Sequence, residues 1–341
     1  MINRRLTSLA VAGALAVVPS GVLGFTSGEA FASVHAPGMT KLTYVYDFPG
    51  PDFELVPVVV AERQGFFQKE HLSVNVKFPP DTSTTVKMLA TGSGQIGFIT
   101  TTDMAVAVNV GAPIISIANY SMTNNWAMFA KPGTTLSLAT LKGKKIFSYG
   151  DTWTEAMLPF VLRKAHLAQS QVKIIANPTG NDLTYLLQGR VNVSTNTTNY
   201  ELAGFDTTKG LKGHLSELLG IDAGCPNVPI WVYATTRSYA QSHGATVTAF
   251  MAAIAGATKW AVAHPAQAAA DFDRTYPSSG YTDAYNLEGW KLTIPLLANA
   301  AGQYFTQTNA QWTTVATALK GIKLVSSVPA ATTYYTNKFL P

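Results

Sequence analysis

Two hydrophobic periodicities alternate along the chain and indicate its secondary structure. Apolar residues at every second position in 41–46 and 72–78 predict strands, and apolar residues at helical spacing in 82–90 and 153–165 predict helices. The predicted strands are 41–46, 72–78, 96–100, 114–118, 144–149, 172–176, 190–195 and 228–235. The predicted helices are 55–64, 82–90, 104–110, 153–165, 182–188, 245–264, 266–276, 282–300 and 308–320. This alternation of strands and helices is typical of an α/β fold.

The alternation stops at a crossing segment, residues 120–131, and then begins again. Residues 187–193 (LQGRVNV) repeat the helix–glycine–strand step of residues 89–98. We therefore expect an α/β fold of two doubly wound, Rossmann-like lobes joined by two hinge crossings, with a ligand cleft between them. Residues 41–121 together with 237–341 are expected to form lobe I, and residues 122–236 lobe II.

Residues 92–97 (GSGQIG) match the G-x-G-x-x-G dinucleotide-binding pattern, but their context is reversed. That pattern binds a pyrophosphate when it follows a strand and opens a helix. Here a predicted helix precedes the glycines and a predicted strand follows them, and residues 104–120 contain no Asp or Glu for a ribose. We interpret the segment as a turn from helix into strand rather than a nucleotide site.

The first 32 residues have the features of a secretory signal peptide. A basic start at residues 4–5 precedes an apolar region at 6–18, and the small–large–small triplet 30–32 (AFA) fits a cleavage site. We expect cleavage before Ser33 and a periplasmic mature protein. The alternative is an uncleaved anchor, although residues 19–21 interrupt the apolar region.

The composition of the chain excludes several classes of binding site and enzyme. Only 13% of residues are charged, and the formal net charge of +5 is not clustered in the sequence, which argues against a nucleic-acid partner. Cys225 is the one cysteine, which excludes an intramolecular disulfide and a multi-cysteine metal site. The sequence has no H-E-x-x-H, G-x-S-x-G or Walker A motif. We expect a monomer without a metal, a cofactor or catalytic residues.

Loops at the carboxyl ends of the predicted strands supply the candidate ligand-binding residues, because ligands of such sheets bind there. Several of these loops carry aromatic side chains, which stack on planar ligands and exclude water, or else pack inside their own lobe. The candidates are Asp47, Phe48, Asp52, Phe53, Glu54, Thr101, Thr102, Asn125, Trp126, Tyr149, Asp151, Thr152, Trp153, Asn181, Asn199 and Tyr200.

The same loops are acidic in a chain that is basic overall. They hold no Lys or Arg, and their acids are Asp47, Asp52, Glu54, Asp81, Asp103, Asp151 and Asp182. This asymmetry favours a neutral or cationic ligand that carries an amine or an amino-heterocycle. Two alternatives stay open: the last four acids stand where helices begin and could be N-caps, and helix N-termini could bind an anion.

Several segments together resemble a known family. Residues 65–76 (GFFQKEHLSVNV), 95–98 (QIGF), 111–114 (GAPI), 141–146 (LKGKKI) and 187–193 match its recurring steps, with departures at Asn192 and Val193, where Asp and Ala are usual. The chain resembles periplasmic solute-binding proteins of ABC importers, in the branch that binds sulfonates or thiamine-pyrimidine precursors. The resemblance implies a type II periplasmic binding protein-like fold, capture of a small molecule between two lobes and delivery to an ABC permease in the inner membrane.

The resemblance also raises an enzyme alternative. Eukaryotic relatives in this family are thiamine-pyrimidine synthases, which the resemblance associates with a pyridoxal-phosphate lysine and a cysteine-rich iron motif. Cys225 alone does not supply that motif. A cell-surface structural protein is a third class, but the internal repeats typical of that class are absent from the sequence.

Overall fold

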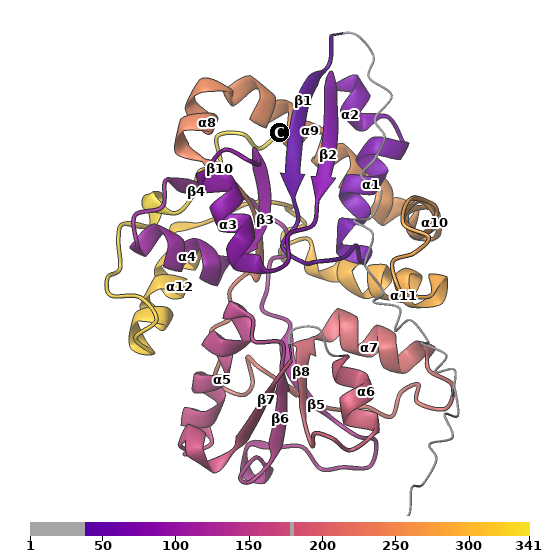
Figure 1. Ribbon diagram of the computed structural model, residues 1–341, viewed down its shortest axis with the longest axis vertical. Coiled ribbons are helices and arrows are strands. Elements are labelled where there is room, and N and C mark those ends of the chain that lie inside the picture. Colours follow the sequence, from indigo (N-terminus) through magenta and orange to yellow (C-terminus); the bar gives the residue numbers. More distant parts are fainter. Residues whose placement is uncertain (1–37, 178–180) are drawn as a thin grey trace, which may run out of the picture.

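The computed structural model describes residues 38–177 and 181–341, which fold into two α/β lobes, one above the other in Figure 1. The sheet of lobe I has the strand order β2-β1-β3-β10-β4, and only β10 runs antiparallel to its neighbours. Its strands are β1 (Thr40–Val45), β2 (Leu72–Lys77), β3 (Ile96–Thr100), β4 (Ile114–Asn119) and β10 (Trp231–Thr236). The predicted α/β fold is confirmed.

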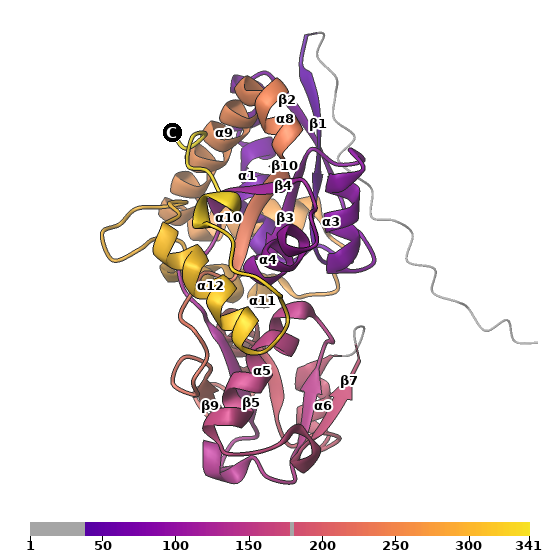
Figure 2. The same cartoon turned by 90° about the vertical axis from the view of Figure 1, so that its left-hand side faces the viewer.

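Helices cover both faces of the lobe I sheet (Figure 2). Helices α1 and α9 pack together on one face, and α3 and α4 lie on the other. The helices of lobe I are α1 (Val56–Arg63), α2 (Phe66–Lys69), α3 (Thr82–Ala90), α4 (Thr101–Asn109), α8 (Arg237–Ser242), α9 (Gly244–Ala263), α10 (Pro265–Thr275), α11 (Asp283–Thr293) and α12 (Asn309–Gly321). Helix α9 is long and apolar enough to cross a membrane, but Phe250, Met251 and Ile254 are buried in the core of lobe I.

Lobe II is built on a smaller sheet. Strands β8 (Ser194–Thr197), β5 (Trp126–Ala130) and β9 (Ser216–Leu219) are antiparallel neighbours, and β6 (Lys145–Ser148) pairs in parallel with β7 (Lys173–Ala176). The amide of Phe147 donates to the carbonyl of Val193, which joins the two groups of strands. Helices α5 (Thr152–Lys164), α6 (Asp182–Leu187) and α7 (Thr198–Thr207) complete the lobe.

Two crossing segments connect the lobes, residues 120–125 and 220–230, and they are hydrogen-bonded side by side. Thr123 and the backbone of Asn124 both donate to Asn227, and the amide of Ile230 donates to Ser121. The second crossing ends at β10, which pairs with β3 and β4, so residues 231–236 belong to the sheet of lobe I. The expected boundary of lobe II at residue 236 is therefore wrong. The prediction that residues 126–130 belong to the crossing segment is also wrong, because these residues form β5 in the sheet of lobe II.

Packing explains two of the glycines in the G-x-G-x-x-G segment. A Cβ atom on Gly94 would lie 2.3 Å from Val45, and one on Gly97 would lie 2.7 Å from Leu89. The segment connects α3 to β3, in the predicted order of helix before strand. These glycines allow close approach of a helix to a sheet, and the nucleotide interpretation is excluded by the order of the elements. The expected signal peptide, residues 1–32, lies outside the described residues.

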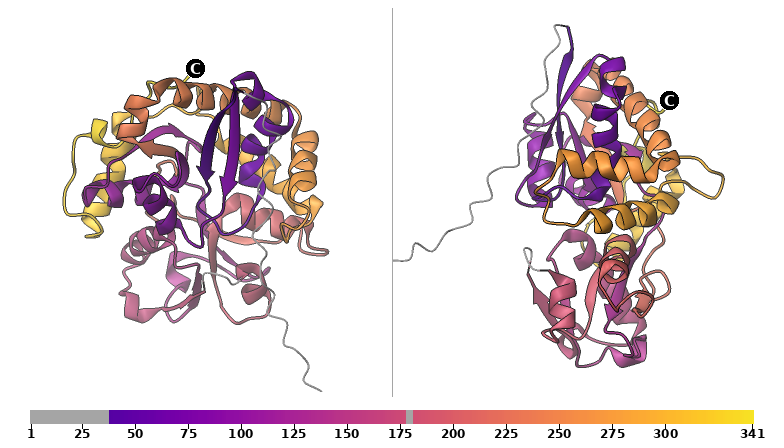
Figure 3. Two further views of the ribbon diagram at one scale, coloured as in Figure 1. Left: turned by 45° about the horizontal axis from the view of Figure 1, so that its top comes forward. Right: turned by 90° about the vertical axis from the view of Figure 1, so that its right-hand side faces the viewer.

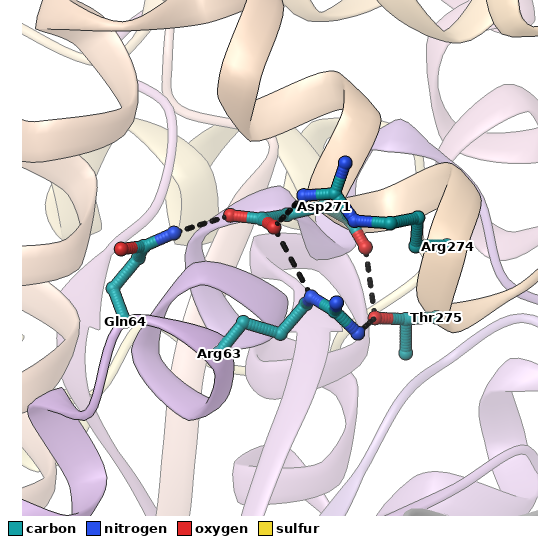
Figure 4. A network of polar contacts seen from close by, with 5 residues as sticks. All are labelled: Arg63, Gln64, Asp271, Arg274 and Thr275. Atoms are coloured by element: carbon teal, nitrogen blue, oxygen red, sulfur yellow. Dashed lines mark hydrogen bonds and ion pairs between the residues drawn. The ribbon is translucent and has the colours of Figure 1, made fainter.

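A polar network ties α1 to α10 (Figure 4). The buried carboxylate of Asp271 accepts from Arg63 at 3.1 Å and from Gln64 at 2.7 Å, and it also pairs with Arg274. Bonds to a buried, doubly paired carboxylate fix the relative position of two helices more strongly than exposed ion pairs do. Both helices also contact the short segment that follows β1 in lobe I. The right-hand view of Figure 3 shows α10 and α11 stacked above lobe II.

Candidate functional site

Three acidic residues follow β1 and are buried together. Asp47, Asp52 and Glu54 are 3%, 1% and 5% exposed. Asp52 caps the short 3-10 helix Phe53–Leu55, accepting from the amide of Glu54 at 2.9 Å, and it also accepts from the hydroxyl of Tyr46 at 2.7 Å. The loop that separates a strand from a helix thus presents carboxyls to the interior rather than to water.

In the part of the chain that the structure describes, these three carboxyls have no cationic partner. The ion pairs among the described residues join Arg63 and Arg274 to Asp271 and Lys291 to Glu288, all elsewhere. Burial therefore raises the pKa of Asp52 to about 6, and it raises the pKa of Asp47 and Glu54 well above the usual range, with neighbouring carboxyls adding to the effect. A buried carboxyl without a cation is costly, and such groups gather at functional sites.

Lobe II reaches this cluster through Asn199. Its amide nitrogen donates to Glu54 Oε1 at 3.2 Å and to Thr293 Oγ1 at 3.0 Å, and its amide oxygen accepts from Asn125 at 2.9 Å. Asn125 is on the first crossing, Asn199 is in the first turn of α7, and Glu54 and Thr293 are in lobe I. A continuous set of hydrogen bonds thus joins a hinge segment to the acidic cluster.

Aromatic side chains pack around the acids from both lobes. Phe53 lies 4.4 Å from Tyr200 of lobe II and 5.7 Å from Tyr285 of α11, measured between ring centroids. Tyr200 also lies beside Asp52 and Glu54, where its side chain lowers the pKa of both carboxyls. Gly289 makes room for Phe53, since a Cβ atom there would lie 2.3 Å from the ring.

A second interlobe contact lies at the start of α4. Thr152, at the start of α5 in lobe II, donates to Asp103 Oδ1 at 2.6 Å, and its hydroxyl is 3.4 Å from that of Thr102. Asp103 and Thr100 form a capping box, and Thr101 donates to the carbonyl of Pro229 in the second crossing. Burial raises the pKa of Asp103.

The structure adds residues that sequence reasoning missed. Two of them lie against Phe98: Tyr120, after the end of β4, and Trp231, at the start of β10. Burial raises the pKa of Tyr120, and the nearby charges of Glu54 and Asp52 raise it further. The Tyr120 hydroxyl, the Trp231 indole nitrogen and the hydroxyl of Thr197 are buried and have no hydrogen-bond partner within residues 38–177 and 181–341. A strand-end tyrosine or tryptophan in an apolar run carries no sequence signal that separates it from the core.

Four of the expected ligand-binding residues lie in an apolar core or at the surface of the described structure. Trp126 is buried in an apolar cluster and donates to Thr154 at 3.2 Å, so it packs in the core. Trp153 packs in the same cluster, but its indole nitrogen, like that of Trp231, is buried without a partner in the described structure. Asn181 is exposed and caps α6, while Phe48 is an exposed side chain.

Two of the four acids at helix starts are N-caps in the structure. Asp81 caps α3 and Asp151 caps α5, each accepting from the backbone three residues on. Asp182 is not a cap: it accepts from the hydroxyl of Tyr149 at 2.9 Å and from the amide of Asn196 at 2.8 Å. Among the residues placed by the structure, no group of three or more His, Cys, Asp or Glu has the arrangement of a metal site.

Comparison with known proteins assigns the family. The model of the NMT1/THI5-like family matches residues 52–268, so the chain belongs to this family. A putative thiamine biosynthesis protein of Haemophilus influenzae is 26% identical over 77% of this chain and 82% of its own length. A formylaminopyrimidine-binding protein of Halalkalibacterium halodurans is 24% identical over 61% of this chain and 63% of its length. The resemblance inferred from the sequence motifs is confirmed.

Solved structures show the same fold. The periplasmic aliphatic sulphonate-binding protein SsuA of Escherichia coli superposes with a TM-score of 0.66 at 17% identity, over 87% of this chain and 92% of that one. The periplasmic nitrate-binding protein NrtA of Synechocystis PCC 6803 superposes with a TM-score of 0.63 at 12% identity, over 89% and 88%. The protein thus has the type II periplasmic binding protein-like fold that the motifs implied.

Proposed function

We propose that this protein is the extracytoplasmic solute-binding component of an ABC importer, and that it binds a small organic molecule with an amine or amino-heterocyclic group between its lobes. A membrane permease would receive the ligand, and the mature protein would work as a periplasmic monomer. The names of the binding-protein relatives support the class. The ligand chemistry rests on the residues of this chain.

One observation carries the proposal: buried acids and unpartnered donors meet where the lobes meet. Asp47, Asp52 and Glu54 offer carboxylate oxygens without a Lys or Arg partner among the described residues. Tyr120 and Trp231 offer an O–H and an N–H without a protein acceptor. An amine-bearing heterocycle satisfies both sets, because it donates to carboxylates, accepts from O–H and N–H groups, and stacks on aromatic rings.

An organic anion such as a sulfonate is the alternative that helix N-termini support. Helix α7 begins at the junction, and its N-cap Thr197 makes no capping hydrogen bond. However, the first turn of α7 already faces carboxyls, because Asn199 donates to Glu54 and Tyr200 lies beside Asp52. An anion there would raise the pKa of these two buried acids further, whereas an ammonium group would stabilise their ionised forms, so we favour the amine-bearing ligand.

A pyrimidine synthase is the enzyme alternative, favoured by one relative. The 4-amino-5-hydroxymethyl-2-methylpyrimidine phosphate synthase of Candida albicans is 22% identical over 70% of this chain and 72% of its length. The iron motif implied for such enzymes does not fit here. Cys225 is buried, contacts the carbonyl of Met157, and has a pKa raised by burial to about 12, so it is not a thiolate ligand. We therefore propose a binding protein rather than an enzyme.

Mass spectrometry of the purified protein tests the class. Protein isolated under native conditions and then denatured should release a stoichiometric small molecule that contains nitrogen. An absorbance band near ~400 nm in the native protein, of the kind a pyridoxal Schiff base gives, would instead favour the synthase class.

A further inference from the structure

Six cations gather at the end of lobe II that faces away from lobe I. Strand β6 runs toward lobe I, since α5 begins four residues after its end and contacts Asp103 through Thr152. The starts of β6 and β7 and the end of β5 therefore lie at the opposite end. The cations there, called the basic pole below, are Lys131, Lys142, Lys144, Lys145, Lys173 and Arg190.

The strand register places these cations next to one another. Lys145 and Lys173 are direct partners on the parallel pair β6 and β7, and the amide of Lys173 donates to the carbonyl of Lys144. The amide of Asn192, two residues beyond Arg190, donates to the carbonyl of Lys145. On the other side, the Lys131 ammonium approaches to 3.4 Å the position that a Cβ atom on Gly189 would occupy.

Within residues 38–177 and 181–341, no carboxylate forms an ion pair with a cation of the basic pole. All three ion pairs among the described residues lie in lobe I. Glu217 on β9 pairs with Phe129, two residues before Lys131, but it forms no ion pair in the described structure, and the charge that acts on it is that of Asp222 rather than a cation. Like charges directly opposite on neighbouring strands are destabilising, so Lys145 and Lys173 form an unfavourable pair without a compensating partner.

The chemistry of the pole fits a diffuse anionic surface better than a protein groove. A protein interface normally has an apolar or aromatic anchor at its centre. The large exposed apolar side chains of the described chain, Phe48, Val110, Leu324 and Val328, all lie in lobe I. Lysines on exposed strand starts are flexible point charges, and clusters of four to eight such cations bind anionic lipid headgroups.

We propose that the basic pole binds anionic phospholipid headgroups, so that the protein lies on a membrane surface through the end of lobe II. This contact is independent of the ligand site, because the pole and the acidic cluster lie at opposite ends of the strands of lobe II. It would concentrate the protein at the surface where a permease is embedded.

Vesicle sedimentation tests this proposal directly. The full mature chain should sediment with vesicles containing phosphatidylglycerol, should not sediment with pure phosphatidylcholine vesicles, and should be released as salt shortens the screening length. The double variant Lys145→Glu/Lys173→Glu should bind phosphatidylglycerol vesicles at least about tenfold more weakly, since each cation near such a surface contributes a several-fold increase in binding. The double variant Lys142→Gln/Arg190→Gln, which removes two exposed cations without reversing their charge, should weaken the binding to a smaller extent.

A matched control separates a local site from net charge. Lys87→Glu/Lys259→Glu changes the total charge equally, but on exposed positions of lobe I. The proposal predicts that this control keeps most of the binding and that all variants keep the wild-type melting temperature. Equal loss in the control, equal binding to neutral vesicles, or tighter binding to a polyglutamate peptide than to vesicles would overturn it, the last result assigning the pole to an acidic protein.

Discussion

Asn199 of lobe II donates a hydrogen bond to Glu54 of lobe I across 3.2 Å, and both side chains are buried. The same amide accepts from Asn125, a residue of the hinge crossing. The ligand-binding carboxyl that we propose is therefore connected to the segment that would bend when the lobes move. A ligand that contacts Glu54 is in a position to bias the opening of the lobes, because its contacts differ between the open and closed arrangements.

Glu54→Gln should separate binding from stability. The substitution keeps an acceptor for Asn199 but removes the carboxylate, so affinity for an amine ligand should fall by about 10- to 150-fold, the 1.5–3 kcal/mol of a hydrogen bond to a charged group. The unliganded variant should melt at a higher temperature at neutral pH, because burial penalises the ionised form. Titration calorimetry and thermal melts measure the two effects. The exposed Glu155→Gln is the control, and an equal loss of affinity there would contradict the assignment.

Stability of the unliganded protein should decrease as pH rises through the range of the buried acids. The pKa of Asp52 is raised by burial to about 6 in the folded state, from 3.8. Between these two pKa values the folded state keeps a proton that the unfolded state has lost. The free energy of unfolding should therefore fall by about 3 kcal/mol as the pH rises from about 4 to about 6. Urea unfolding across this interval measures the slope. Asp52→Asn should flatten it, and an unchanged slope in the variant would show that Asp52 does not titrate in this way.

Gly289→Ala should damage both the fold and the site. The new Cβ atom would lie 2.3 Å from the Phe53 ring, which packs on Tyr200 across the lobe junction. Overpacking of this kind costs about 1–3 kcal/mol, and the displaced ring should also weaken ligand binding. Gly321→Ala, with nothing within 4 Å of its Cβ position, is the matched control. Equal melting temperatures for the two variants would mean that Phe53 is not held as described.

The exported protein should begin near Ser33. The expectation depends on the basic start, the apolar region at residues 6–18 and the triplet at 30–32. N-terminal sequencing of protein from a periplasmic extract checks it. Membrane-bound material with an intact Met1 would favour the uncleaved anchor and contradict the proposed localisation.

Periodicity predicted most of the fold, and its failures have physical reasons. Residues 82–90 and 96–100 match α3 and β3 to the residue, because a capped helix and a buried strand both have strong patterns. Strand β5 was missed because WAMFA is uniformly buried and shows no alternation. Helix α7 was missed because its apolar positions follow no single face, and 190–195 was placed before the real strand β8 (Ser194–Thr197).

The candidate site was predictable where chemistry clusters locally, and not where the fold assembles it. Asp52 and Glu54 stand two residues apart in one loop, so the acidic cluster was visible in the sequence. The pairing of Asn199 with Glu54 spans 145 positions and depends on the closure of two lobes. Tyr120 and Trp231 stand at strand ends with the composition of core residues, and only the sheet register brings them beside Phe98.

Thermal-shift measurement with a panel of ligands tests the central claim most directly. Amines and aminopyrimidines should raise the melting temperature, since a ligand at a hundred times its dissociation constant adds about 2.7 kcal/mol of stability, and Glu54→Gln should abolish that shift. If alkanesulfonates or nitrate raise the melting temperature while amines and aminopyrimidines do not, the buried acids do not select the ligand and the proposed chemistry of the site is contradicted.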